Sequence, residues 1–481
     1  MSGHSTWSEV RRSRTGIGRT VDLDLSGAWV IDPAAGRQGP ADLVITDGVV
    51  EALTWLEGAD AKGIDDSGVI VAPGFTDLHV HLREPGNTAA ETIASGLAAA
   101  AHGGFTTVCA MPNTTPPIDS AAMVGAAREA ASASGSPVRL RSYGAITAGR
   151  AGEQLASLGS LAKAGVIGFS DDGSPVQRAE LFRNVLAYAG MLELPVVEHP
   201  EDLELTVGAE AHDGLVATVL GLKGWPTAAE AGAAARAVAL LADVLPDVPG
   251  ARLHLTHLST AASIEVVRRA KAAGLPVTCD VTPHHLALTD EWIAGSRRWA
   301  WAALADDGTA RDPWRDRALT AAPYDTSLRV NPPLRSAAEA RACLEGLLDG
   351  TVDAIATDHA PHNQVDKDVE FGAARPGIAG IETALGIVLE LVDAGLLPLA
   401  RAIELLTTGP AHVLRLEAAS GLAVGAEADL VVIDRSERWT VDVSSLLTKG
   451  FGHPLAGRSL PGEVLLTVAG GRLAYEADRT A

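Results

Sequence analysis

The sequence predicts an α/β protein built on a (β/α)8 barrel of the TIM type, with a small β-sandwich made from both chain ends. Three observations favour this fold class. From about residue 73 to 416, apolar strand-like runs alternate with alanine-rich helical segments, as in a parallel barrel. Short strands and turns occupy residues 22–72, and similar short strands return after residue 417. The 481 residues suffice for one large domain with a smaller companion.

The N-terminal part of the chain predicts a tail followed by short strands. Residues 1–21 are polar and carry several arginines without a following apolar run, so we expect a flexible tail and no secretory signal. Residues 41–50 are apolar on both sides of Asp47-Gly48, which is typical of a β-hairpin. Residues 22–72 should therefore join residues 417–481 in the β-sandwich.

The central part, residues 73–416, is expected to form the barrel. Its predicted strands are 106–109, 165–169, 195–198, 252–256, 276–279 and 353–356. Its predicted helices include 89–101, 228–245 and 261–273. After residue 417, strands are expected at 428–434, 464–469 and 472–475. Residues 291–328 hold four tryptophans without a clear period, which indicates a lid or an insertion that covers either the site or an interface.

Composition excludes several classes of function. The formal net charge of −22, from 60 acidic and 38 basic residues, argues against a nucleic-acid partner. No stretch reaches the roughly 18 apolar residues that a membrane helix needs. Three cysteines lie far apart without metal-ligand spacing, which favours a reducing, cytoplasmic location over a disulfide framework. A hydrophobic content of 47% indicates a globular chain with a sizeable core.

A histidine pair follows the first predicted barrel strand. In residues 77–83 (DLHVHLR), side chains alternate along an extended backbone, so Asp77, His79 and His81 share one face. Two imidazoles at this spacing can bind one metal ion. A bound metal can turn water into a nucleophile, so this segment predicts a metal-dependent hydrolytic site.

The ends of four other predicted strands carry similar side chains. Barrel enzymes place their active sites at the carboxyl ends of the strands. The candidates at these ends are Asp171, Asp172, His199, His257 and Asp358. Together with the first pair, and counting one of the adjacent Asp171 and Asp172, they supply four histidines and two carboxylates at one level of the barrel. Such a ligand set suits zinc or a similar divalent ion.

Several other histidines compete with these candidates. Strand alternation separates His254 from His257 and His359 from Asp358, and we assign the metal to His257 and Asp358. His102 and His412 lie in predicted helices and are interpreted as structural. The adjacent His284 and His285 are expected to support the site or the fold rather than to bind the metal.

Six motifs stand out in the chain: residues 77–86 (DLHVHLREPG), 111–114 (MPNT), 169–173 (FSDDG), 281–286 (VTPHHL), 331–335 (NPPLR) and 356–362 (ATDHAPH). With these motifs the chain resembles dihydroorotase of the amidohydrolase superfamily. The resemblance covers about residues 40 to 475. The arginine after the histidine pair and the NPPLR run are not general features of barrels, so the match is specific.

The resemblance implies a zinc site with one or two ions per chain. By this resemblance, His79, His81 and Asp358 bind one metal, His199 and His257 bind a second, and Asp172 bridges the two. Many relatives use a carbamylated lysine as the bridge. None of the six lysines here lies at a strand end in the site, which favours the aspartate-bridged form.

The substrate implied by the resemblance, dihydroorotate, carries a carboxylate that a guanidinium group can bind in a forked geometry. Arg83 lies on the same face as His81 and suits this role. The resemblance adds His81, Asn113, Asn331 and His362 as substrate contacts. The Phe-Gly contact of the family is Pro376-Gly377 in this chain, a departure that disfavours a side-chain contact and leaves a backbone contact.

The predicted reaction is reversible hydrolysis of (S)-dihydroorotate to N-carbamoyl-L-aspartate, with Asp358 accepting the proton from water. The resemblance implies ring closure in de novo pyrimidine synthesis. A hydantoinase, dihydropyrimidinase or allantoinase is the alternative within the class, disfavoured by Arg83 and the missing lysine. A non-catalytic scaffold partner of aspartate transcarbamoylase is the alternative outside it. A homo-oligomer or association with that transcarbamoylase is left open.

Overall fold

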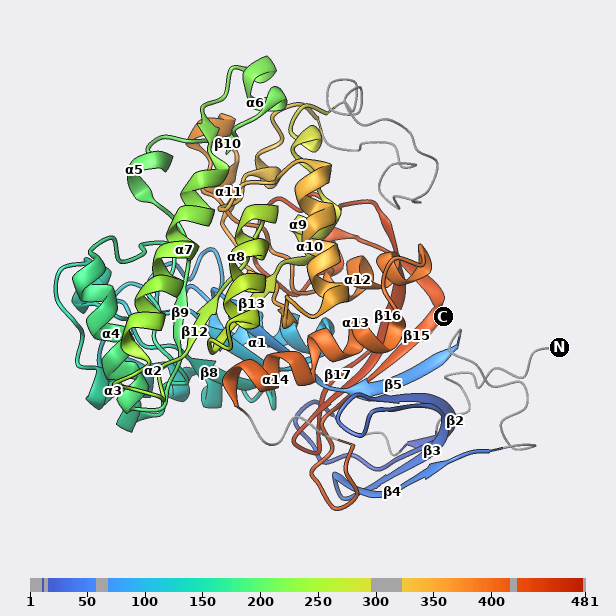
Figure 1. The fold of residues 1–481 in the computed structure, drawn as a ribbon. Coiled ribbons are helices and arrows are strands. Elements are labelled where there is room, and N and C mark those ends of the chain that lie inside the picture. Colours follow the sequence, from blue (N-terminus) through green and yellow to red (C-terminus); the bar gives the residue numbers. More distant parts are fainter. Residues whose placement is uncertain (1–10, 13–15, 58–67, 296–321, 416–421, 479–481) are drawn as a thin grey trace.

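This computed structural model describes residues 11–12, 16–57, 68–295, 322–415 and 422–478 (Figure 1). Its parallel strands form a closed ring. One half of the ring is β6 (Phe75–Val80), β7 (Phe105–Ala110) and β8 (Arg139–Ser142). The other half is β9 (Val196–Glu198), β12 (Leu253–Leu255), β13 (Val277–Val281) and β14 (Ala354–Ile355).

Two sets of parallel bridges join these halves. Phe169 bridges Gly144 after β8 on one side and Val196 of β9 on the other, and it thus takes the place of a strand. His359, after β14, bridges Val80 of β6 and closes the ring. With the Phe169 segment, the described residues supply eight members to the ring. The predicted (β/α)8 barrel is confirmed, although residues 165–169 join the ring only through Phe169, by one bridge on each side, instead of forming the regular strand we expected.

Helices pack around the ring (Figure 1). They are α1 (Ile93–His102), α2 (Ala121–Ala133), α3 (Leu158–Ala164), α4 (Ala179–Met191), α7 (Thr227–Val244), α8 (Ala261–Ala272), α10 (Ala337–Asp349), α12 (Ala384–Asp393), α13 (Leu399–Leu406) and α14 (Thr408–Leu414). Side-chain caps fix where some of them begin. The Thr92 hydroxyl accepts a hydrogen bond from the Ser95 amide in a capping box, so α1 begins four residues later than predicted.

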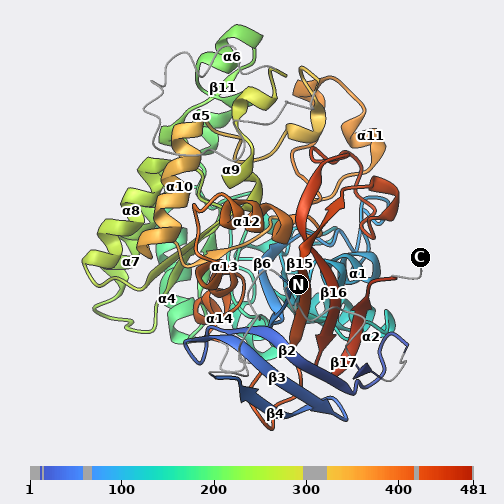
Figure 2. The same ribbon diagram turned by 90° about the vertical axis from the view of Figure 1, so that its right-hand side faces the viewer.

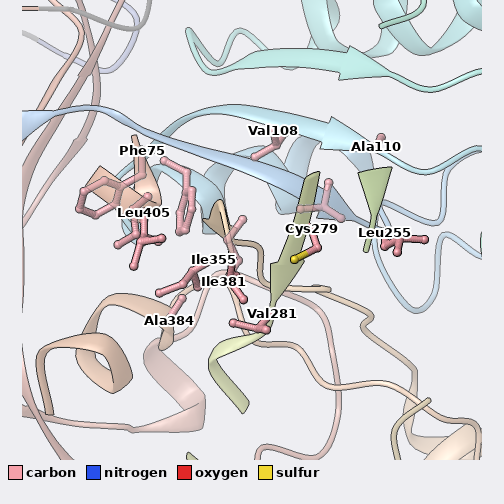
Figure 3. Close-up of a cluster of buried hydrophobic side chains, with 14 of the residues drawn as sticks. Phe75, Val108, Ala110, Leu255, Cys279, Val281, Ile355, Ile381, Ala384 and Leu405 are labelled. Atoms are coloured by element: carbon pink, nitrogen blue, oxygen red, sulfur yellow. The ribbon is translucent and has the colours of Figure 1, made fainter. Parts of the chain in front are cut away.

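The main hydrophobic core lies between the strands and the helices. Figure 3 shows part of it, with Val108, Leu255 and Ile355 from the strands and Ala384 and Leu405 from α12 and α13. All are buried, as the near-continuous apolar runs of the strands require in a sheet covered on both faces. This core holds the carboxyl ends of the strands in a common frame for the site.

Both chain ends build the second domain, as predicted (Figure 2). Its strands are β1 (Arg11–Arg12), β2 (Leu23–Asp32), β3 (Arg37–Thr46), β4 (Val49–Trp55), β5 (Val69–Pro73), β15 (Leu430–Thr440), β16 (Ser459–Ala469) and β17 (Arg472–Glu476). They follow one hydrogen-bonded path, β17-β16-β15-β5-β2-β3-β4, with β1 beside β2. Bridges from Thr20 to Arg472 and from Val49 to Glu427 join distant parts of this path around a separate apolar core.

Turn chemistry explains two features of this domain. Asp47 and Gly48 both have positive φ, 50° and 75°, which the predicted two-residue hairpin turn between β3 and β4 requires. Gly74 separates β5 of the sheet from β6 of the barrel. A Cβ at Gly74 would lie 2.2 Å from the Thr106 side chain, so glycine permits this close passage from one domain to the other.

Two excursions extend the barrel. Between β9 and α7 lie α5 (Leu203–Thr206), β10 (Ala211–His212), α6 (Leu215–Leu220) and β11 (Gly224–Trp225). In the tryptophan-rich segment, Trp292 is buried and its ring lies 4.3 Å from the guanidinium carbon of Arg458. The other tryptophans of that segment lie outside the described residues. Among the described residues, no helix combines the length and apolarity needed to cross a membrane.

Candidate active site

All the predicted metal ligands meet at the carboxyl ends of the barrel strands. They come from the ends of five ring members, with His79 and His81 both at the end of β6, and each is at most 7% exposed. The six residues are His79, His81, Asp172, His199, His257 and Asp358. Two groups among them, His79–Asp172–His257 and His79–His81–Asp358, have ligand atoms close enough to hold a metal ion.

The His79–His81–Asp358 group has the spacing of ligands around one ion. The Nε2 atoms of His79 and His81 are 3.2 Å apart, and Oδ1 of Asp358 lies 3.4 Å and 3.0 Å from them. Ligands with bonds of 2.0–2.1 Å around a tetrahedral zinc ion lie about 3.3 Å from one another. The three side chains therefore fit a shared divalent ion.

Asp172 connects this group with a second one. Its Oδ1 lies 3.4 Å from His79 Nε2, 3.5 Å from His199 Nδ1 and 3.6 Å from His257 Nε2. Its Oδ2 lies 3.6 Å from His81 Nε2. Buried Oδ1 has no hydrogen-bond partner among the described residues, although a buried carboxylate oxygen needs one. The carboxylate thus faces both ligand pairs, which is the geometry of a bridge.

The charges of the cluster also fit a cation. Burial lowers the pKa of His79, but Asp172 and Asp358 outweigh this effect and raise the pKa to about 9. Burial raises the pKa of Asp172, but the surrounding histidines outweigh it and hold the pKa well below its usual range. The carboxylates are thus ionised and draw positive charge into the cluster, which a divalent ion would supply.

Supporting side chains fix the ring orientation of three histidines. Nδ1 of His79 lies 2.7 Å from Thr256 Oγ1, Nδ1 of His81 lies 2.8 Å from Asn113 Oδ1, and Nε2 of His199 lies 2.7 Å from Glu201 Oε2. Such partners set which ring nitrogen is free to bind a metal.

Sequence reasoning missed Thr256, Glu201 and Asp280. Asp280 accepts hydrogen bonds from the His257 amide and from Thr256 Oγ1. A carboxylate inside an apolar strand is unusual, and this position alone could have indicated that Asp280 supports the site. Glu201 lies two residues after the predicted ligand His199, and that spacing was a signal as well.

The competing histidines have other partners. His254 contacts Asp280 at 2.7 Å and His359 contacts Glu91 at 3.3 Å, so neither belongs to the ligand cluster. His102 contacts Glu382 at 2.5 Å. His285 lies 3.1 Å from the Pro332 carbonyl, while the neighbouring His284 has a buried Nε2 without a partner among the described residues.

The predicted substrate contacts surround this cluster. Arg83 donates from Nε to the Pro361 carbonyl at 3.0 Å, and its Nη2 lies 3.4 Å from His362 Nε2. Asn113 also donates to Asp172 Oδ2 at 3.3 Å, so it contacts the bridging carboxylate. Arg83 therefore connects the segment after the histidine pair with the segment after Asp358.

Asn331 and the Pro376-Gly377 pair lie in neighbouring loops. Asn331 donates from Nδ2 to Glu201 Oε2 at 2.9 Å, and its Oδ1 is buried without a partner among the described residues. The Pro376 carbonyl lies 2.9 Å from His362 Nε2. The Gly377 N–H donates to the Arg329 carbonyl at 2.8 Å, so a backbone contact from this pair to substrate would have to use an oxygen.

Comparison with known proteins gives consistent results. A family model described as dihydro-orotase-like matches residues 68–263. A dihydroorotase of Anaeromyxobacter dehalogenans is 46% identical over 95% of this chain and 98% of its own length. A dihydroorotase of Pelotomaculum thermopropionicum is 43% identical over 95% of this chain and 99% of its own.

Solved structures resemble the chain in fold. The L-hydantoinase (dihydropyrimidinase) from Arthrobacter aurescens has a TM-score of 0.75 and 23% identity, covering 94% of this chain and 96% of its own. A dihydropyrimidinase from Brevibacillus agri has a TM-score of 0.70 and 20% identity, with 94% of each chain covered. At these identities the likeness supports the barrel fold alone.

Proposed function

This chain belongs to the dihydroorotase family, and from that premise we propose that its buried cluster catalyses the interconversion of (S)-dihydroorotate and N-carbamoyl-L-aspartate. We propose zinc as the metal, with one or two ions per chain, and a role in de novo pyrimidine synthesis in the cytoplasm. When bound, such an ion acidifies water and polarises a carbonyl oxygen. The observation that carries the proposal is the buried cluster of six candidate ligands, in which two groups of three have ligand atoms within 4.8 Å of one another.

The remaining roles fall to side chains of the chain itself. Asp358 accepts the proton of the attacking water and returns it to the ring nitrogen as the amide bond breaks. Arg83 binds the carboxylate of the substrate, and Asn113, Asn331 and His362 orient its ring. In the direction of synthesis the same groups act in reverse order. His81, with its Nδ1 directed at Asn113, belongs both to the metal ligands and to the substrate contacts.

The bridging group distinguishes this reading from the rival cyclic amidohydrolases. We propose Asp172 as the bridge because the lysines in the described part of the chain have partners elsewhere or lie on outer helices. Lys271 pairs with Asp353, Lys367 donates to two backbone carbonyls, and Lys163 lies in α3.

An assay in both directions tests the activity. We expect the purified chain to hydrolyse dihydroorotate and to cyclise carbamoyl-aspartate, to lose both activities after chelation, and to regain them with zinc. Dihydrouracil and hydantoin, which lack the carboxylate, should be poor substrates. Equal or faster hydrolysis of either would identify a dihydropyrimidinase or hydantoinase instead, and a purified chain without metal would favour the scaffold.

Arg83→Met is the variant that tests carboxylate recognition. Loss of a hydrogen-bonded charge pair should raise the KM for dihydroorotate roughly 10- to 100-fold. The slow hydrolysis of dihydrouracil should change little, because that compound has no carboxylate. A similar loss with both substrates would contradict the assigned role.

Association with itself or with an aspartate transcarbamoylase stays a prediction, which sedimentation of the chain alone and with that enzyme would check.

A further inference from the structure

A buried carboxylate that the proposed mechanism does not use connects the metal cluster with the substrate loop. Glu201 lies between β9 and α5 and is buried. Its Oε2 lies 2.7 Å from His199 Nε2 and accepts a hydrogen bond from Asn331 Nδ2 at 2.9 Å. Its Oε1 accepts a hydrogen bond from the Thr206 hydroxyl at 2.5 Å. One oxygen therefore contacts two residues that are 132 positions apart in the sequence (331 − 199).

The contact with His199 determines the tautomer of that ring. A carboxylate only accepts hydrogen bonds, so the proton of a neutral His199 must reside on Nε2. The lone pair is then on Nδ1, which lies 2.8 Å from His257 Nε2 and 3.5 Å from Asp172 Oδ1. Glu201 thus directs the metal-binding nitrogen into the second ligand group.

The contact with Asn331 determines which end of that amide is left for a ligand. The NH2 group of Asn331 is directed at Glu201, and the amide oxygen Oδ1 is buried with no partner among the described residues. A buried amide oxygen without a partner is costly unless a ligand supplies a donor. A cyclic amide offers ring N–H groups of this kind, whereas the substrate carboxylate requires a cation such as Arg83.

We propose that Glu201 is a positioning residue that couples the metal ligand His199 to Asn331, and that Asn331 thereby presents its oxygen to a ring N–H of the substrate. This inference rests on the proposed function for its substrate part. Its metal part rests on the geometry of Glu201 and His199 alone. The alternative is a purely structural role, in which Glu201 only anchors α5 through its hydrogen bond with Thr206.

Zinc release and steady-state kinetics of the zinc-loaded full chain separate these roles. Glu201→Ala should speed zinc release to a chelator roughly 10- to 100-fold, and it should also raise the KM for dihydroorotate. Glu201→Gln should recover most of both, because its amide oxygen can accept from His199 and Asn331. Thr206→Val removes the hydroxyl that bonds to Glu201 Oε1 and to the Asp202 carbonyl, but it leaves the contacts of Glu201 with His199 and Asn331. This variant should leave zinc release and KM unchanged. Exposed Glu204 in the same helix supplies the matched control, Glu204→Gln.

A double-mutant cycle tests the coupling itself. If Glu201 acts on the substrate through Asn331, the KM of the variant Glu201→Ala/Asn331→Ala should equal that of Asn331→Ala within about twofold. Multiplying effects on KM, or an unchanged zinc release rate in a folded Glu201→Ala chain, would overturn the proposal. So would a Thr206→Val variant that reproduces both effects.

Asn331→Asp keeps the proposal testable if Glu201→Ala does not fold. The carboxylate introduced at position 331 should repel Glu201, displace it from His199 and thereby speed zinc release. Direct attraction between the introduced carboxylate and the zinc ion would instead slow release. Faster release supports the coupling, and unchanged or slower release refutes it. Zinc release does not depend on turnover. A chain that is inactive on dihydroorotate would therefore refute the proposed function, but the zinc-release test of the contact between Glu201 and His199 would still apply.

Discussion

Three residues of the proposed site have left-handed backbone conformations. The φ angles of Arg83, His257 and Asp358 are 59°, 40° and 46°. For non-glycine residues this conformation costs of order 1–3 kcal/mol each, and it persists only where surrounding contacts impose it. The His257 amide, for example, donates to Asp280 at 2.6 Å. Because His257 and Asp358 follow their strands in sharp turns, their side chain directions depend on the turn and not on strand alternation.

The role of Asp358 at the residue scale is tested by Asp358→Asn. The amide keeps the size and one oxygen of the side chain but cannot hold the transferred proton, so turnover should fall roughly 10²- to 10⁴-fold. The variant should retain at least one zinc ion, because the remaining histidines and Asp172 still offer ligands. Measurements of kcat and zinc content check both statements. Asp368→Asn, at an exposed position, is the control, and near-normal turnover of Asp358→Asn would refute the assignment.

At the scale of elements, the loop around Gly377 supports the substrate side of the site. Gly377 has a φ of 147°, and a Cβ there would lie 2.4 Å from the Ala360 carbonyl oxygen and 3.1 Å from His362 Cδ2. The predicted contact residues Pro376 and His362 meet at this point. The position thus requires glycine for both its backbone conformation and its close approach.

Gly377→Ala should therefore displace the segment that holds His362. We expect a loss of more than about 1 kcal/mol in the free energy of unfolding, together with a higher KM for dihydroorotate. Denaturant unfolding and kinetics measure the two effects. Gly395→Ala is the control, because Gly395 also has a positive φ, 71°, but has open space around its Cβ position. An unchanged KM in Gly377→Ala would argue against a substrate role for this loop.

A second element, β10, carries a pH-sensitive contact. Arg335 donates from Nη1 to His212 Nδ1 at 3.2 Å, which requires a neutral imidazole. Burial, and then the charge of Arg335, lower the pKa of His212 to about 4. The unfolded chain, with an ordinary pKa near 6.5, therefore binds an additional proton between these values. This stabilising contribution is complete above pH 6.5 and is lost as the pH falls toward 4.

His212→Asn should flatten this pH dependence. The asparagine oxygen can replace Nδ1 as the acceptor for Arg335, and it does not titrate in this range. The free energy of unfolding should then fall less steeply between pH 6.5 and 4 than in the unmodified chain. Denaturant titrations at several pH values test this. An equally steep fall in both proteins would show that other groups control the acid response.

At the scale of the whole molecule, one buried carboxylate joins the two domains near the site. Glu91, just before α1, lies 3.3 Å from His359 Nε2 in the barrel. It accepts hydrogen bonds from the Thr448 hydroxyl at 2.5 Å and the Lys449 amide at 3.3 Å, both in the segment between β15 and β16. The Phe451 amide of this segment also donates to the His362 carbonyl at 2.7 Å. The second domain, built from both chain ends, thus supports the loop that carries Asp358 and His362.

Thr448→Val should weaken this support. Removing the hydroxyl takes away one hydrogen-bond donor to the buried Glu91 carboxylate, which should cost roughly 1–3 kcal/mol in the free energy of unfolding. Thr46→Val is the matched control, since it removes a threonine–glutamate bond to Glu51 that is exposed on the same domain. That variant should change stability by less than about 0.5 kcal/mol. Equal effects of the two variants would mean that the buried contact does not join the domains.

The amino-acid sequence alone determined the elements and the identity of the cluster. Repeated β-α units predict the barrel, Asp47-Gly48 predicts the hairpin of the second domain, and polar residues after apolar runs predict the ligands that the structure brings together. These features could be predicted because they depend on neighbouring residues, through side-chain periodicity and turn chemistry. The resemblance in motifs supplied the substrate contacts other than Arg83, which strand alternation places on the face of His81.

Only the tertiary structure decided how these side chains are held. Phe169 joins the ring by single bridges, and Glu201, Asp280 and Thr256 orient the histidines through contacts between separate elements. The Glu201–Asn331 bond, for instance, spans 130 residues. Local propensities carry no information about such pairs, because their distances are set when the strands close into a ring and the loops pack above it.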